Sequence, residues 1–117
     1  MRPPSNTSSS GVEKPRPKRA NLDKPATLIV HTTLTPIRVV NISTTGVGVI
    51  SSQNLPPKTI TAIRLSLYFY NELTELTLQA KVVHSTPVQH DYLVGLALFD
   101  VNPFTLRVIN QFVMLNT

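Results

Sequence analysis

The chain of 117 residues has no cysteine and no long apolar run. Without cysteine, neither disulfides nor thiolate metal sites can support the fold, which favours a reducing compartment. The N-terminus lacks the apolar region of a signal peptide, and no segment approaches the ~20 apolar residues of a membrane span. We therefore expect a soluble, cytoplasmic protein of one small domain that does not insert into a membrane.

Charged residues are scarce outside the N-terminal part of the chain. Residues 1–24 carry six basic side chains against Glu13 and Asp23, which gives +4 of the total net charge of +5. The remaining residues carry five basic and four acidic groups, which gives +1. The charge therefore belongs to a tail and does not form a basic nucleic-acid platform, although such a tail can also serve only to keep a protein in solution.

Residues 1–18 are rich in proline, serine and threonine and contain almost no large apolar side chain. Such a segment cannot offset the entropy cost of its own ordering. The sequence predicts a flexible basic N-terminal arm over residues 1–18 and a folded domain over residues 19–117.

From residue 25 onward, β-branched and alternating residues predict about six strands with short connections. Thr35 and Pro36 mark a predicted turn after the first strand. Apolar side chains with a period of two, such as Ile63 and Leu65, define an inner face. The pattern favours a six-stranded antiparallel β-barrel, because closure hides the strand edges. The predicted strand segments are ATLIVHTT (26–33), IRVVNIS (37–43), GVGVISS (46–52), TAIRLSLYF (61–69), ELTLQAKVV (75–83) and DYLVGLALF (91–99).

The last segment, residues 101–115, has the signals of a helix. Asn102 is the expected N-cap and Pro103 the expected first helical residue. Apolar side chains recur at helical spacing at Phe104, Val108, Phe112 and Leu115. We expect this stripe to cover the barrel, so that the domain is all-β with one C-terminal helix.

The histidines do not predict a metal site, because His31, His84 and His90 have no carboxylate or cysteine partner at ligand spacing. His84 and His90 are each followed by a polar residue, but adjacent residues on a strand point to opposite faces. No nucleophile therefore has a positioned base. We expect that the protein is not an enzyme and uses no cofactor.

The segment Asn41–Gly46, NISTTG, interrupts two apolar runs with polar residues and a glycine. One interpretation is a plain turn, since asparagine, serine and glycine supply local hydrogen bonds and permit positive φ. The other is a binding site. Asn41 and Ser43 are two residues apart and would project from the same face of a strand end, while Gly46 would let a ligand approach the backbone.

This segment resembles the D/N-x-S-x-x-G motif of PilZ domains, which are small cytoplasmic β-barrels of bacteria. The surroundings are similar too. The basic stretch KPRPKRANLDKPATL precedes the first strand, where PilZ proteins carry R-x-x-x-R, and YLVGLALFD looks like the closing strand before the final helix. The resemblance spans about residues 13–114.

The resemblance implies that the chain binds cyclic di-GMP, the bacterial second messenger, and signals to a downstream protein effector. Guanine N7 and O6 suit a bidentate arginine, and the two phosphate charges suit cationic partners. Asn41 offers an acceptor for guanine N1–H, and Ser43 offers a hydroxyl for base or phosphate. The residues implied for cyclic di-GMP binding are Arg16, Lys18, Arg19, Asn41, Ser43 and Gly46.

The arginine spacing departs from the family pattern. With Arg19 as the second arginine, the first falls on Pro15, and Arg16 lies one residue late. This departure leaves open a PilZ-like adaptor that has lost the nucleotide and acts by protein contact, for example in pilus assembly or motility. A third alternative, a barrel for single-stranded nucleic acid, needs aromatic stacking platforms, and the chain has only seven aromatic residues.

Overall fold

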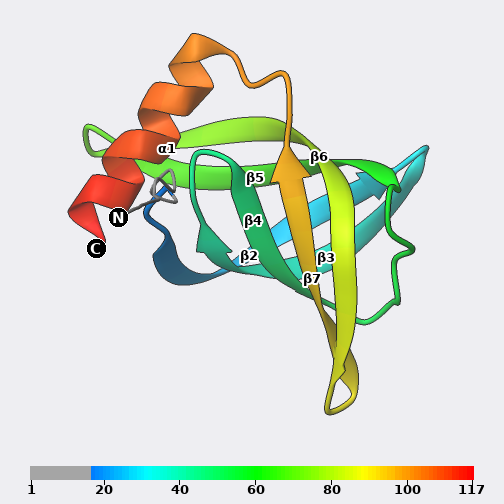
Figure 1. The fold of residues 1–117 in the computed structure, drawn as a ribbon. Helices are drawn as coiled ribbons and strands as arrows, with labels where there is room; N and C mark the ends of the chain where they lie inside the picture. Colours follow the sequence, from blue (N-terminus) through cyan, green and yellow to red (C-terminus); the bar gives the residue numbers. More distant parts are fainter. Residues whose placement is uncertain (1–16) are drawn as a thin grey trace, which may run out of the picture.

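The computed structural model describes residues 17–117, which form a closed antiparallel barrel of six strands and one C-terminal helix (Figure 1). Around the barrel the strands follow the order β2-β3-β4-β7-β6-β5. The predicted fold class is confirmed. The elements are β2 (Ala20–Val30), β3 (Thr33–Ile42), β4 (Gly46–Ser51), β5 (Ile60–Phe69), β6 (Glu72–Val88), β7 (Asp91–Leu98) and α1 (Pro103–Leu115).

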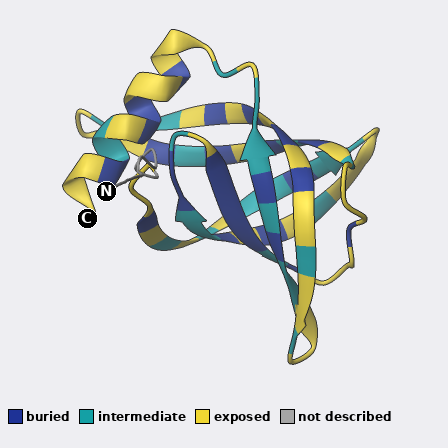
Figure 2. Ribbon diagram, in the orientation of Figure 1, coloured by how far each residue is buried: buried dark blue, intermediate teal, exposed yellow. Residues whose placement is uncertain are grey.

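Alternation along the strands builds the core, as the sequence predicts. On β5 the side chains of Ile63, Leu65 and Leu67 are buried, and Leu76 and Leu78 are their counterparts on β6. Figure 2 shows this alternation along β5 and the first half of β6, whereas β4 is buried at almost every position. Burying one face of every strand fixes the register, since a slip of one residue would turn these apolar side chains outward.

The first predicted turn is misplaced. The chain reverses at His31 and Thr32, where His31 has φ 55°, and Pro36 lies inside β3 opposite Thr27. Proline is tolerated there because β4 pairs with β3 only from Arg38 onward, so that Pro36 has a strand partner on one side alone.

The helix begins as predicted, but its buried face is rotated. Asn102 Oδ1 accepts a hydrogen bond from the Thr105 backbone N–H at 2.8 Å, and Pro103 opens the helix. Phe104 and Leu115, expected to cover the barrel, are 45% and 75% exposed. Val108 is buried as predicted and Phe112 packs partly buried against the core, but the other buried residues are Thr105, Ile109 and Val113. With 3.6 residues per turn, a displacement of one position moves the contact face by about 100°.

Residues 1–16, and with them Arg16 and most of the predicted arm, lie outside the described residues. The boundary expected between residues 18 and 19 stays a prediction. Pro17, Lys18 and Arg19 are exposed and lead directly into β2 at Ala20. Among residues 17–117, no helix is long and apolar enough to cross a membrane.

Candidate functional site

The turn between β3 and β4 is held by Ser43. Its Oγ accepts hydrogen bonds from the backbone N–H groups of Thr45 at 3.2 Å and Gly46 at 3.1 Å, and its own N–H donates to the Gly46 carbonyl at 2.9 Å. Only 1% of Ser43 is exposed. The expectation that Ser43 shares an outward face with Asn41 is wrong, because β3 ends at Ile42 and the chain turns inward there.

Asn41 faces outward and meets the arginine that precedes the barrel. Arg19 Nη1 donates to Asn41 Oδ1 at 2.6 Å. The strand register explains the meeting, since β2 begins at Ala20, which pairs with Ile42. Antiparallel pairing thus brings the end of the basic segment to the motif, and two residues that are 22 positions apart in sequence share one surface.

Glycines make room for these side chains. A β-carbon on Gly48 would lie 2.5 Å from Asn41 Nδ2, closer than real atoms approach, so the Asn41 amide lies directly over this glycine. A β-carbon on Gly46 would lie 3.1 Å from the Leu96 carbonyl oxygen and 3.2 Å from Arg19 Nη2. Side chains at positions 46 and 48 would therefore displace both polar groups.

Arg19 and Gly46 line a depression of about 150 Å³ on the outside of the barrel, which we name the outer hollow. Arg19 supplies its only charged side chain among the described residues, so the outer hollow favours an anion. His84 of β6 also lines it. The lining residues are Arg19, Thr45, Gly46, Val83, His84, Gly95, Leu96 and Ala97.

Of the residues predicted to bind a ligand, the structure brings together Arg19, Asn41 and Gly46. Ser43 lies beneath the turn, and Lys18 is exposed one residue before Arg19. His84 was missed by sequence reasoning, which set it aside as a lone histidine. A glycine within a strand is a known sign of close approach, and Gly95, the cross-strand partner of His84, could have drawn attention to it.

A second cation near the motif is already engaged. Arg38 Nε donates to Asp23 Oδ1 at 2.7 Å, and both side chains are exposed. The hydrogen bond from Arg38 holds the pKa of Asp23 below its ordinary value. Arg38 thus belongs to an ion pair at the border of the site.

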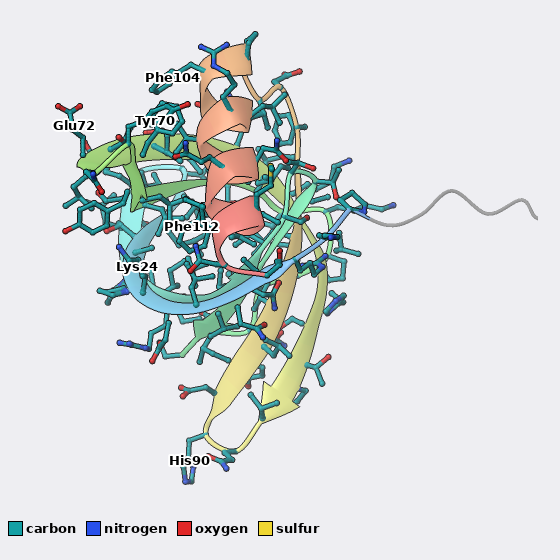
Figure 3. All side chains as sticks on the ribbon, turned by 90° about the vertical axis from the view of Figure 1, so that its left-hand side faces the viewer. Lys24, Tyr70, Glu72, His90, Phe104 and Phe112 are labelled. Atoms are coloured by element: carbon teal, nitrogen blue, oxygen red, sulfur yellow. The ribbon has the colours of Figure 1, made fainter. Side chains whose placement is uncertain are left out.

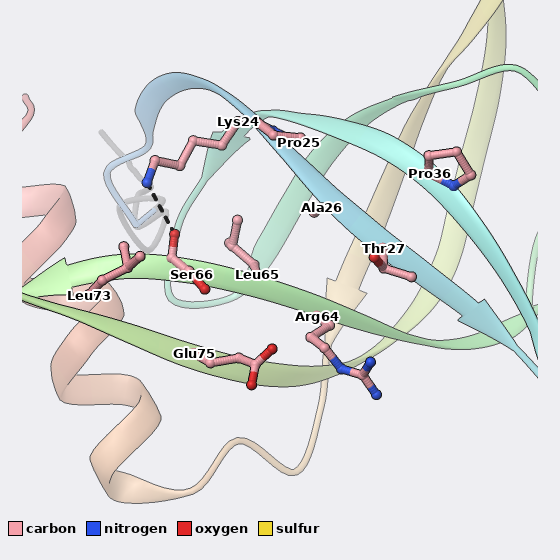
Figure 4. Close-up of a pocket in the computed structure, with 10 residues that line it drawn as sticks. All are labelled: Lys24, Pro25, Ala26, Thr27, Pro36, Arg64, Leu65, Ser66, Leu73 and Glu75. Carbon is pink, nitrogen blue, oxygen red and sulfur yellow. Dashed lines mark hydrogen bonds between the residues drawn. The ribbon is translucent and has the colours of Figure 1, made fainter.

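A larger depression of about 510 Å³ lies where β2 separates from β5 (Figure 4). These strands pair only between Thr27–Ile29 and Ala62–Arg64, so the seam is open beyond that point. Lys24 Nζ donates across it to the Ser66 carbonyl at 3.3 Å. Only Lys24, Arg64 and Glu75 are charged among its lining residues, and none belongs to the predicted ligand set.

No group of three or more histidine, cysteine, aspartate or glutamate residues that could hold a metal ion occurs in residues 17–117. The candidate site is therefore one arginine, one amide and a glycine turn on the outside of a small antiparallel barrel. The chain is thus a small antiparallel barrel with a polar turn between β3 and β4, the second and third strands of the ring.

The PilZ domain family model matches residues 13–115, and the chain belongs to this family. No curated protein matches it in sequence. The resemblance found in the motif, the basic entrance and the terminal helix is thereby confirmed.

Solved structures of low sequence identity share the fold. The inhibitor of motility MotI/DgrA of Bacillus subtilis has a TM-score of 0.78 at 10% identity, with 88% of this chain and 51% of that chain covered. The PilZ domain of YcgR from Escherichia coli, solved with c-di-GMP, has a TM-score of 0.70 at 10% identity and coverages of 89% and 92%. PlzA of Borreliella burgdorferi, also solved with c-di-GMP, has 0.62 at 16%, with coverages of 86% and 41%. The chain thus spans about half the length of MotI/DgrA.

Proposed function

We propose that this chain is a non-enzymatic receptor for cyclic di-GMP, which binds in the outer hollow between the basic entrance and the turn Asn41–Gly46. The hydrogen bond between Arg19 and Asn41, beside Gly46, is the observation that carries the proposal. This hydrogen bond joins the basic stretch before the first strand to the turn Asn41–Gly46, two parts of the family motif that are far apart in sequence. Membership of the PilZ family and the c-di-GMP in the YcgR and PlzA structures support it.

The donors and acceptors at the site suit the two parts of this ligand. A guanidinium has five N–H donors, so the single bond from Arg19 to Asn41 leaves donors for guanine N7 and O6 or for phosphate. The Asn41 amide can accept from the guanine N1–H edge. The lining contains no carboxylate to repel the two phosphates.

The signalling step follows from where the ligand would bind. Contacts from Arg16, Lys18 and Arg19 would fasten the basic segment to the barrel and change the surface that a protein effector meets. Ser43 would act through the turn that it holds, because its hydroxyl is engaged with two backbone N–H groups.

Calorimetric titration of the full chain with cyclic di-GMP tests the proposal, with GTP and a short single-stranded oligonucleotide as controls. We expect saturable binding of cyclic di-GMP alone. Arg107→Ala, which removes a cation from α1, is the matched control for Arg19→Ala. Binding of the oligonucleotide but not of cyclic di-GMP would instead favour the nucleic-acid alternative.

A second candidate function, protein contact without a nucleotide, has one observation in its favour. A groove of about 650 Å³, named here the α1 groove, is lined by Phe69, Tyr70, Arg107, Asn110, Gln111, Met114 and Leu115. Tyr70 and Met114 are 75% and 69% exposed. Figure 3 shows Tyr70 beside α1, on the same side of the molecule as Phe104 of that helix. Exposed apolar surface of this kind suits a protein partner. If the folded chain shows no binding heat when it is titrated with cyclic di-GMP, protein contact without a nucleotide becomes the favoured function.

A further inference from the structure

His84 reaches the outer hollow through a local irregularity of β6. Val82 pairs with Leu96, whereas His84 pairs with Gly95, so Val83 is an extra residue in the strand. Val82 is buried and strict alternation would turn His84 inward as well. The bulge turns it outward instead.

The same irregularity occurs on β3, on the other side of the outer hollow. Val39 pairs with Val49 and Asn41 with Gly48, so Val40 is the extra residue and Asn41 is turned outward. The two segments are alike in sequence, RVVN at 38–41 and KVVH at 81–84. Two bulges therefore place one polar side chain on each side of the same surface.

Pairing aligns these side chains in one row across four strands. Asn41 pairs with Gly48, Gly48 with Gly95, and Gly95 with His84. Asn41 lies over Gly48, and His84 lies over Gly95, whose β-carbon would be 2.5 Å from His84 Nε2. Because facing β positions on neighbouring strands are about 5 Å apart, the amide and the imidazole approach each other above the two glycines.

The orientation of the imidazole adds chemical detail. The β position of Gly95 is 2.5, 2.8 and 3.1 Å from His84 Nε2, Cε1 and Cδ2. These distances are nearly equal, as they are when a ring turns its face, rather than its Nε2 vertex, toward the glycine. His84 is exposed, so the other face of the ring is turned toward solvent.

We propose that His84 is a stacking platform for one guanine base, and that it forms the second wall of the nucleotide site opposite Arg19. The inference rests on the proposed function and extends it. Histidine rings stack on nucleobases, and a ring seated on a backbone is already positioned for this contact. Arg19 would then hold phosphate or a base edge, while His84 selects for a flat base.

Titration of three variants with cyclic di-GMP tests this role. His84→Ala should weaken binding about tenfold, the effect expected for loss of one stacked base. His84→Phe keeps a flat ring without its nitrogens and should stay within about threefold of the original affinity. His90→Ala removes a histidine at the far tip of the β6–β7 hairpin (Figure 3) and should change nothing.

Gly95→Ala provides a second test that keeps the histidine. The new methyl group would meet the imidazole, the mobile end of a side chain, so the ring must lift while the backbone remains in place. Affinity should fall severalfold in the original chain and should not fall further when His84→Ala is already present. Thermal midpoints of all variants check that the barrel remains folded.

The results separate the two proposals. Absence of cyclic di-GMP binding to the unaltered chain would overturn the proposed function. Normal binding by that chain and equal binding by His84→Ala would overturn only the role of His84. A loss in both His84→Ala and His84→Phe would show a polar contact and would also overturn stacking.

Discussion

The outer hollow and the α1 groove are both depressions at the surface of one small barrel, but different residue types line them. Of the three glycines in residues 17–117, Gly46 and Gly95 line the outer hollow and Gly48 is the cross-strand partner of Gly95. They leave room for the side chains of Arg19, His84 and Asn41. The α1 groove has no glycine and is bordered by exposed rings and long apolar side chains. Glycines allow polar groups to converge on a small ligand, whereas apolar side chains offer area to another protein. Variants that affect one depression and spare the other test this division.

Arg19→Ala should have the largest effect on nucleotide binding. Loss of a bidentate guanine or phosphate contact costs on the order of 1–3 kcal/mol, so affinity should fall by roughly fivefold to a hundredfold. The thermal midpoint should hardly move, because Arg19 is exposed and precedes β2. Calorimetry and thermal unfolding measure the two quantities.

Tyr70→Ala is the matched change in the α1 groove and should leave cyclic di-GMP affinity unaltered. Equal losses in Arg19→Ala and Tyr70→Ala would contradict the division between the two depressions.

Gly48→Ala should have a somewhat smaller effect. A methyl group at this position would lie 2.5 Å from Asn41 Nδ2 and must push the amide away from Arg19. We expect a severalfold loss of affinity, and none when Asn41→Ala is already present, because the two changes act on one side chain. Additive losses in the double variant would show that Gly48 acts independently of Asn41.

Ser43→Ala should mainly affect stability. It leaves the N–H groups of Thr45 and Gly46 without their acceptor at a buried turn, which costs about 1–3 kcal/mol. For a domain of this size, the thermal midpoint should fall by roughly 4–20 °C, while affinity at a temperature well below the midpoint stays within about twofold. A tenfold loss of affinity with an unchanged thermal midpoint would show that Ser43 contacts the ligand directly.

The sequence predicted the parts of the molecule that obey strict periodicity. Alternation on β5 and β6 placed Ile63, Leu65 and Leu78 inside the barrel, and the Asn102–Pro103 pair marked the start of α1. The family followed from the motif and its surroundings.

What the sequence could not predict depends on departures from periodicity. A bulge leaves no mark in composition, so neither Val40 nor Val83 indicated that Asn41 and His84 would face the same surface. The face of α1 was misassigned because aromatic residues were assumed to be inside, yet Phe104 contacts Phe69 at the rim with a ring separation of 5.7 Å. The row formed by Asn41, Gly48, Gly95 and His84 can be recognised only once the pairing register of the four strands is known.

Asp23→Asn should have the smallest effect, and it refines the account of the outer hollow. The pair Asp23–Arg38 lies near the motif, because Arg38 is three residues before Asn41 on β3 and pairs with Ile50, two residues from Gly48 along β4. Neutralising Asp23 removes an anion and releases a cation near the proposed site, so affinity for cyclic di-GMP should rise about two- to threefold at low salt and not at high salt. The pKa of Asp23 is lowered from 3.8 in the folded chain. Any stabilisation by the pair is therefore present above pH 3.8 and is lost as the pH falls through the lower folded value. Because both side chains are exposed, the thermal midpoints of the two proteins should nearly coincide at pH 7 and converge further in acid. A fall in affinity on Asp23→Asn would mean that the ion pair holds Arg38 in place for the ligand and is part of the site.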